Sequence, residues 1–255
     1  MAVKSIAIVI VGDELLSGRI RDVNASYLAQ RLRELGSDLQ RIEFIGDQVS
    51  MIAETVRRLS PCHDSVLLCG GIGPTHDDVT MEGVAEAFGV GLVQRPELVA
   101  LLHAWGKKLP EGAIERLASI PDGAELITVE DHFPAVMKEN VFILPGVPKL
   151  LRAKFEWFAH LFRSDERSVE TILFVLERSE LVVAEAIARL AETVGPEVSL
   201  GSYPQRLGPI SPELQLVLTA RNPAALERAK TALLNAFPDA RELSGGQGET
   251  EWDGV

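Results

Sequence analysis

Ser65–Thr80, Ser-Val-Leu-Leu-Cys-Gly-Gly-Ile-Gly-Pro-Thr-His-Asp-Asp-Val-Thr, decides the fold of this 255-residue chain. Its first part, Ser65–Cys69, is a short apolar run of the kind that forms a strand buried on both faces of a parallel sheet. A glycine-rich segment follows at once, and Thr80 is expected to cap a helix that runs to Phe88. We therefore predict a buried strand, a tight loop and a helix, which is the repeating unit of α/β proteins.

The same order of elements occurs twice before this stretch. The apolar run Ile6–Val11 predicts a strand buried on both faces, and Leu39–Ile45 predicts a second strand. A helix is expected after each strand, the first capped by Asn24 and the second by Ser50. Three such units in succession predict a parallel sheet with right-handed crossovers.

Further along the chain, Val141–Leu144 predicts a fourth buried strand, and Pro148 is well placed to start the helix after it. A helix near Glu97–Lys108 and a short strand at Glu125–Thr128 are expected between them. We predict that residues 1–162 form one domain, a three-layer α/β/α structure around a mostly parallel sheet.

A second, smaller α+β domain is expected over residues 168–240, after a polar linker at Arg163–Arg167. Its predicted strands are Val169–Leu176, Val198–Tyr203 and Glu213–Ala220, and its predicted helices are Glu180–Val194 and Ala224–Phe237. Asn222 and Pro223 give a clear start signal for the last helix. The Gly-rich, acidic stretch Ser244–Val255 (residues 244–255) is expected to be disordered.

The composition argues against several kinds of partner. Lys and Arg number 25 against 37 Asp and Glu, which gives a net charge of -12. Such an acidic surface repels nucleic-acid phosphates and anionic lipids, so we expect no nucleic-acid and no membrane partner. The run Ile6–Val11 is too short to span a membrane, and the two cysteines indicate no disulfide framework. A cytoplasmic protein is expected, and a homo-oligomer.

The loop Gly70–Thr80 is the main candidate site, because ligands of open α/β sheets bind beyond the carboxyl ends of the strands. Glycines let backbone N–H groups approach an anion, and the following helix adds partial positive charge. The alternative is a plain tight turn with aspartates as helix caps. We predict a phosphate site made by Gly70, Gly71, Gly73, Pro74, Thr75 and Thr80.

Two adjacent carboxylates, Asp77 and Asp78, are unexpected in an anion site. A divalent metal ion such as Mg²⁺ or Co²⁺ resolves the conflict, because carboxylates hold the ion and the ion bridges to phosphate oxygens. The turns after the first two strands carry Asp13 and Asp47 and are expected at the same edge of the sheet. We predict catalytic roles for Asp77 and Asp78, and metal binding by Asp13, Asp47, Asp77 and Asp78.

These segments resemble the molybdopterin-binding MoaB/Mog domain family, and within it the CinA branch and the molybdopterin-binding-like domain of eukaryotic FAD synthases. The motifs that carry the resemblance are Gly12–Gly18 with Asp22 and Asn24, Gly46-Asp47, Gly70–Thr80 and Leu144–Pro148. The resemblance covers the chain to about His160. Residues 168–237 resemble the small KH-like domain that follows in CinA proteins.

The resemblance implies a metal-dependent pyrophosphatase that hydrolyses a nucleotide diphosphate such as FAD or ADP-ribose and releases AMP. It also implies ligand contacts from Gly12, Gly18, Asn24, Pro145 and Gly146. The alternative is a molybdopterin- or nucleotide-binding protein, or an adenylyl-transfer step in molybdenum cofactor biosynthesis, without hydrolysis. An interaction protein that only shares the fold is a third possibility, since fold alone does not decide function.

Overall fold

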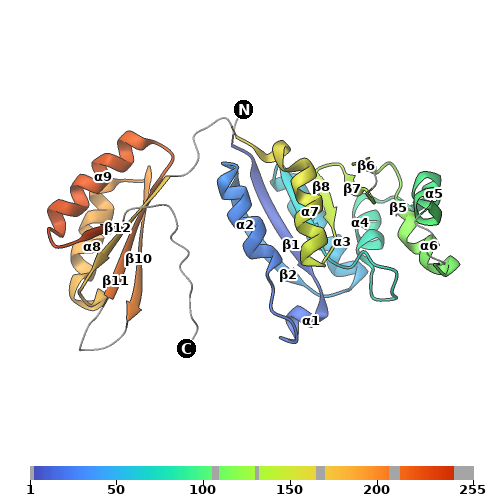
Figure 1. Cartoon of the computed structure of the whole chain (residues 1–255), viewed down its shortest axis with the longest axis horizontal. Helices are drawn as coiled ribbons and strands as arrows, with labels where there is room; N and C mark the ends of the chain where they lie inside the picture. Colours follow the sequence, from blue (N-terminus) through green and yellow to red (C-terminus); the bar gives the residue numbers. More distant parts are fainter. Residues whose placement is uncertain (1–2, 105–108, 130–131, 165–169, 207–212, 244–255) are drawn as a thin grey trace. The chain divides into compact units, whose positions relative to one another are not determined.

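The computed structural model describes residues 3–104, 109–129, 132–164, 170–206 and 213–243. The chain divides into two compact units, Met1–Asp165 and Glu166–Val255, coloured from blue to yellow and from yellow to red in Figure 1. The division falls inside the polar segment Arg163–Arg167, where the linker was predicted. The predicted disordered tail, Ser244–Val255, lies outside the described residues.

The first unit contains a six-stranded sheet with the order β2-β1-β3-β8-β7-β6. Its strands are β1 (Ser5–Val11), β2 (Asp38–Ile45), β3 (Ser65–Cys69), β6 (Glu125–Ile127), β7 (Ala135–Lys138) and β8 (Val141–Leu144). The first three and β8 run parallel, while β7 and β6 extend the sheet antiparallel. The mostly parallel sheet predicted from the sequence is confirmed, and β7 is a strand that the sequence did not predict.

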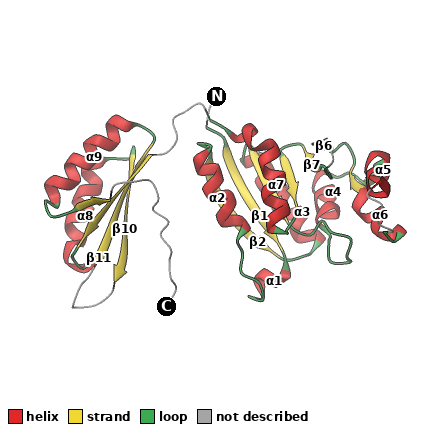
Figure 2. Cartoon of the chain, viewed as in Figure 1, coloured by secondary structure: helices red, strands yellow, loops and turns green. Residues whose placement is uncertain are grey.

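Helices cover both faces of this sheet (Figure 2). They are α2 (Asn24–Glu34) and α7 (Pro148–Phe158) on one face, and α3 (Val49–Leu59) and α4 (Thr80–Phe88) on the other. Strand β1 supplies alternate residues to each core: Ile6, Ile8 and Ile10 face α2 and α7, whereas Ala7, Val9 and Val11 face α3 and α4. This is why β1 is a continuous apolar run, and the three-layer α/β/α fold is confirmed.

Three predicted helix caps are wrong. The side chain of Asp22, rather than Asn24, caps α2 by accepting from the N–H groups of Asn24 (3.1 Å) and Ala25 (3.0 Å). Helix α3 begins at Val49, before Ser50, and has no side-chain cap. Thr80 is already inside α4, and its hydroxyl donates instead to the carbonyl of Gly70, at 2.8 Å.

A peripheral group of short elements contains one predicted helix, α5 (Pro96–Ala104), and three elements that the sequence did not predict. These three are β4 (Leu92–Gln94), α6 (Glu111–Ala118) and β5 (Ser119–Pro121), with β4 and β5 paired antiparallel. Residues 105–108, into which helix α5 was expected to continue, lie outside the described residues. Leu98, Leu102 and Ile114 of this group pack into the core on the α3–α4 face.

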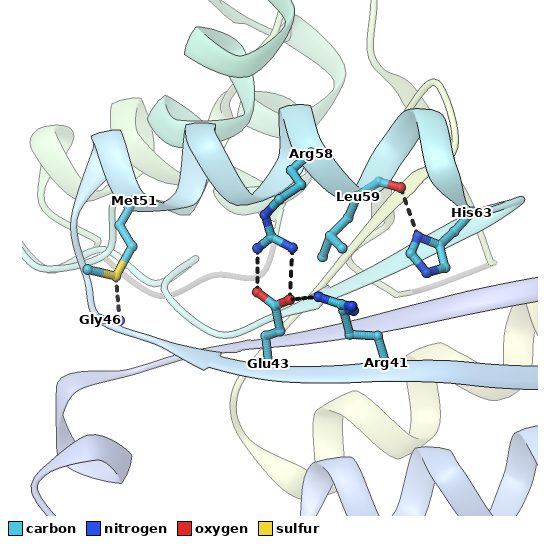
Figure 3. Close-up of polar contacts among 7 residues, drawn as sticks. All are labelled: Arg41, Glu43, Gly46, Met51, Arg58, Leu59 and His63. Atoms are coloured by element: carbon cyan, nitrogen blue, oxygen red, sulfur yellow. Dashed lines mark hydrogen bonds and ion pairs between the residues drawn. The ribbon is translucent and has the colours of Figure 1, made fainter.

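Strand β2 lies at the edge of the sheet and is tied to α3 by an ion-pair cluster (Figure 3). The carboxylate of Glu43 accepts from Arg58 at 2.6 Å and 3.0 Å, and from Arg41 at 3.1 Å. Arg58 is the main reason that the pKa of Glu43 is lowered. At the end of the strand, the N–H group of Gly46 lies 3.4 Å from the sulfur of Met51. These contacts hold the carboxyl end of β2 against α3, and so position the turn that follows.

The second unit is an α+β domain with the sheet order β10-β11-β9-β12. Its elements are β9 (Glu170–Leu176), α8 (Glu180–Val194), β10 (Val198–Arg206), β11 (Glu213–Ala220), α9 (Pro223–Ala236) and β12 (Arg241–Leu243). All strand pairs are antiparallel, and α8 and α9 share one apolar core with the sheet. Asn222 accepts from the N–H group of Ala224, which confirms the predicted start of α9. Strand β12 was not predicted.

No helix in the described parts of either unit is long and apolar enough to cross a membrane.

Two short 3-10 turns, η1 (Ser60–Cys62) and η2 (Ala159–Phe162), and the one-turn helix α1 (Asp13–Leu16) complete the first unit. Helix α1 follows β1 directly and therefore lies at the carboxyl edge of the sheet, visible beyond the strand ends in Figure 1.

Candidate functional site

The loops after β1, β2, β3 and β8 meet around a cavity of about 730 Å³, within the size range of small-molecule sites. The predicted convergence of strand ends therefore occurs. Predicted site residues that line the cavity are Asn24, Asp47, Gly70, Gly71, Gly73, Asp77, Asp78, Pro145 and Gly146. Predicted residues that do not line it are Gly12, Asp13, Gly18, Pro74, Thr75 and Thr80.

The glycine loop is shaped by contacts within the protein. Gly70 and Gly71 have positive φ angles of 107° and 62°, a region that favours glycine. A Cβ atom on Gly70 would lie 2.3 Å from the carbonyl oxygen of Val11, and one on Gly71 would lie 2.5 Å from the hydroxyl of Thr80. Thr80 is fully buried, so its hydroxyl supports the loop and does not face the cavity. This corrects its predicted role as a phosphate donor.

Three consecutive backbone N–H groups of the loop remain available. Within the described residues, those of Gly71, Ile72 and Gly73 donate to no protein acceptor, whereas that of Gly70 bonds to Leu144 at 3.0 Å. All three residues line the cavity, close to the start of helix α4. Successive free N–H groups of this kind, near a helix N-terminus, form concavities that bind anions. This part of the loop can therefore hold a phosphate group.

The two adjacent aspartates have different roles. The carboxylate of Asp78 accepts from the N–H group of Thr75 at 2.8 Å and also from the Thr75 hydroxyl, so it closes the turn of the loop. The side chain of Asp77 is 63% exposed. Asp77 is therefore ionised and accessible, while Asp78 is engaged by the loop itself.

Asp13 and Asp47 link the turns after β1 and β2. The N–H group of Asp13 donates to Asp47 at 2.8 Å, and that of Asp47 donates to Asp13 at 3.3 Å. Burial raises the pKa of Asp47, and the negative charges of Asp13, Glu14 and Asp77 raise it further. The strand ends thus gather an excess of negative charge around Asp47.

Carboxylate oxygens are suitable ligands for a hard divalent cation. Among the described residues, no group of three or more His, Cys, Asp or Glu side chains is arranged to hold a metal ion. Mg²⁺ is commonly held by one or two protein carboxylates, with waters and substrate phosphates as the other ligands. Asp47 and Asp77 fit such a partial set because both line the cavity, whereas Asp13 does not.

Asn24 lines the cavity and carries a buried, unpaired acceptor. Its amide N–H donates to the carbonyl of Gly146 at 2.7 Å, which joins α2 to the loop after β8. The residue is only 7% exposed, yet its side-chain oxygen has no hydrogen-bond partner. Buried polar atoms are rarely left unpaired, so an N–H donor of a ligand is a fitting partner for this oxygen.

Sequence reasoning missed a buried lysine, Lys154 of α7, that also lines the cavity. Its ammonium donates to the carbonyl of Pro134 at 2.7 Å and lies 5.1 Å from the ring centre of Phe133 and 5.9 Å from that of Trp157. A signal was present: Lys154 comes three residues after the buried Leu151 of α7, so it falls on the buried face of the helix.

Two family models match this chain, one over each of its two units. Residues 7–164 match the family model described as probable molybdopterin binding domain. Residues 169–243 match the model described as FAD synthase, middle domain. Both matches agree with the resemblance found in the motifs.

Individual relatives cover the chain to different extents. A protein of Archaeoglobus fulgidus is 37% identical over 78% of this chain and 85% of its own length. A probable FAD synthase of Caenorhabditis briggsae is 34% identical over 79% of this chain, but this chain spans only 44% of its length. The crystal structure of a CinA protein of unknown function from Thermoplasma acidophilum has a TM-score of 0.58 and 28% identity, and covers 63% of this chain and 98% of its own.

Proposed function

We propose that this chain, which belongs to the family of probable molybdopterin-binding domains, is a metal-dependent pyrophosphatase that hydrolyses FAD or ADP-ribose and releases AMP. The observation that carries the proposal is that anion-binding N–H groups and carboxylates open onto one cavity. The N–H groups are those of Gly71, Ile72 and Gly73, and the carboxylates are Asp47 and Asp77. A phosphate could bind the N–H groups while a divalent cation neutralised the repulsion between that phosphate and the carboxylates.

The rest of the cavity suits a nucleotide or pterin ring. Phe133 and Trp157 line it and offer ring faces against which a planar heterocycle can stack. The unpaired oxygen of Asn24 can accept from a ring N–H or amino group. The likeness to a probable FAD synthase supports FAD as one such ligand.

In the proposed reaction a water oxygen attacks the phosphorus of the adenylyl group. The bond from that phosphorus to the bridging oxygen breaks, the other phosphate leaves with the bridging oxygen, and the water gives up one proton. Asp47 and Asp77 would hold a divalent cation, which would supply charge neutralisation and a more acidic water. The N–H groups of Gly71–Gly73 stabilise the negative charge that develops on the phosphate oxygens.

The test is a chromatographic assay of the purified chain with FAD and with ADP-ribose, each in the presence of Mg²⁺, Co²⁺ or EDTA. Metal-dependent release of AMP is expected, with none in EDTA. Absence of AMP from both substrates under every metal condition would overturn the hydrolase proposal.

A second candidate is a nucleotide- or molybdopterin-binding protein without hydrolysis, or one that takes part in adenylyl transfer. The engagement of Asp78 by Thr75 favours it, because one of the two predicted catalytic carboxylates is used to shape the loop. This candidate predicts saturable binding of the nucleotide or pterin with no metal-dependent AMP. The same assay, combined with calorimetric binding, separates the two.

A further inference from the structure

A second cavity, of about 440 Å³, is also lined by residues of the glycine loop. Residues that line both cavities are Ile72, Gly73, Asp78, Leu117, Phe133 and Lys154. Lys154 therefore lies at the junction of the two cavities. Gly73, whose N–H group is free, lines the same junction.

The ammonium of Lys154 lacks an anionic partner. It has three N–H donors, of which one is used by the carbonyl of Pro134. It forms no ion pair with any carboxylate in the described part of the chain, although the residue is only 9% exposed. The ammonium also makes cation–π contacts with the rings of Phe133 and Trp157. A buried cation with unused donors is stabilised strongly when an anion reaches it.

We propose that Lys154 binds the diphosphate of the ligand at the junction of the two cavities, with the nucleotide in the larger cavity and the second organic group in the smaller one. This rests on the proposed function for the diphosphate ligand, but not on its hydrolysis. An anion at the junction meets Lys154 and the free N–H group of Gly73 together. The ligand class is then a diphosphate with an organic group at each end.

The proposal predicts a particular pH dependence of binding. Burial lowers the pKa of Lys154 to about 8, and contact with a diphosphate raises it again. Binding is therefore strong below pH 8 and weakens above it, as the free protein loses this proton. Other charged or titratable side chains around the two cavities are Asp47, Asp77, Asp78, Glu82, Glu115, Arg116 and His132. Comparison of variants at position 154 separates the contribution of Lys154 to the pH dependence of binding from the contributions of these other side chains.

The experiment is calorimetric titration with ADP-ribose in EDTA, whose diphosphate keeps its charge across this range. For the wild type we expect affinity to fall about tenfold between pH 8 and pH 9.5. Lys154→Arg, which stays charged, should keep the affinity and lose this pH dependence. Lys154→Met should bind at least about tenfold more weakly at pH 7 and also show a flat profile. Lys149→Met, on an exposed position of the same helix, is the matched control and should behave as wild type.

The smaller cavity is tested separately with Gly112→Leu. Gly112 lines this cavity, and a Cβ atom there would have no heavy atom within 4 Å, so the backbone at this position accepts a larger side chain. We expect weaker binding of ADP-ribose and unchanged binding of AMP, which needs the larger cavity alone. Equal effects on both ligands, or none on either, would overturn the assignment of the second subsite.

Two results distinguish this inference from the proposed function. If the wild type releases AMP but Lys154→Met binds ADP-ribose as well as the wild type does, the role of Lys154 is wrong and the hydrolase proposal stands. If binding follows Lys154 as described but no metal yields AMP, the inference stands and hydrolysis does not. A wild type that binds no ADP-ribose at any pH overturns both.

Discussion

At the scale of single residues, the glycines at the strand ends make room for side chains of the protein itself. A Cβ atom on Gly46 would lie 2.6 Å from a carboxylate oxygen of Asp13, and one on Gly73 would lie 2.6 Å from one of Asp78. These two glycines therefore let the aspartates fold against the backbone. The proposed anion site therefore rests on the N–H groups of Gly71–Gly73, and not on small residues in general.

Asn24 provides the first prediction at this scale. Asn24→Leu keeps the approximate size of the side chain but removes its unpaired acceptor and the bond to Gly146. We expect affinity for ADP-ribose to fall about three- to tenfold, which corresponds to the loss of one hydrogen bond. Calorimetric titration at pH 7 measures it.

Asn140 is the control for this substitution. Its side chain is satisfied within the protein, through Ser60 and His63, and it does not line the cavity. Asn140→Leu should therefore lower the free energy of unfolding but leave the affinity of the folded protein unchanged. If both variants lose affinity to the same extent, the loss reflects general destabilisation and not a contact with the ligand.

At the scale of elements, the carboxyl end of β2 is held by Glu43 and Arg58 of α3 (Figure 3). Because Arg58 lowers the pKa of Glu43, this pair stabilises the fold above the unfolded pKa of about 4.3 and is lost as pH falls through the folded value. Glu43→Gln should lower the free energy of unfolding by up to about 1 kcal/mol at pH 7. Urea denaturation of the variant and the wild type should converge towards pH 3.

The ion pair between Arg57, also on α3, and Glu86 of α4 provides a matched comparison. Its side chains are 49% and 48% exposed, against 21% for Glu43. Glu86→Gln should therefore change the stability at pH 7 much less than Glu43→Gln does. Equal effects of the two substitutions would contradict the special role of Glu43 at the edge strand.

At the scale of the whole molecule, most of the parallel sheet could be predicted because β1, β3 and β8 are continuous apolar runs that end at Gly or Pro-Gly turns. The start of α2 was mispredicted because Asp22 and Asn24 are both good capping residues, and only the tertiary contact with Gly146 decides between them. The buried Lys154 was missed because lysine on a helix is normally solvated. Its environment depends on Phe133, which is distant in sequence.

All residues that line the two cavities belong to the first unit, Met1–Asp165. Each unit also has its own apolar core. A fragment of residues 1–165 should therefore fold and bind ADP-ribose with the affinity of the full chain. Circular dichroism and calorimetry check this. A folded fragment that binds no ADP-ribose would mean that the second unit contributes to the site.

The most direct test of the central claim is single-turnover release of AMP from ADP-ribose with Mg²⁺, in the wild type and in Asp77→Asn. Asp77 is the accessible carboxylate of the glycine loop, so its replacement removes a proposed cation ligand without disturbing the turn that Asp78 closes. The account predicts AMP release by the wild type and a loss of about a hundredfold or more in the variant, with ADP-ribose binding in EDTA retained. Equal rates in the two proteins would contradict it.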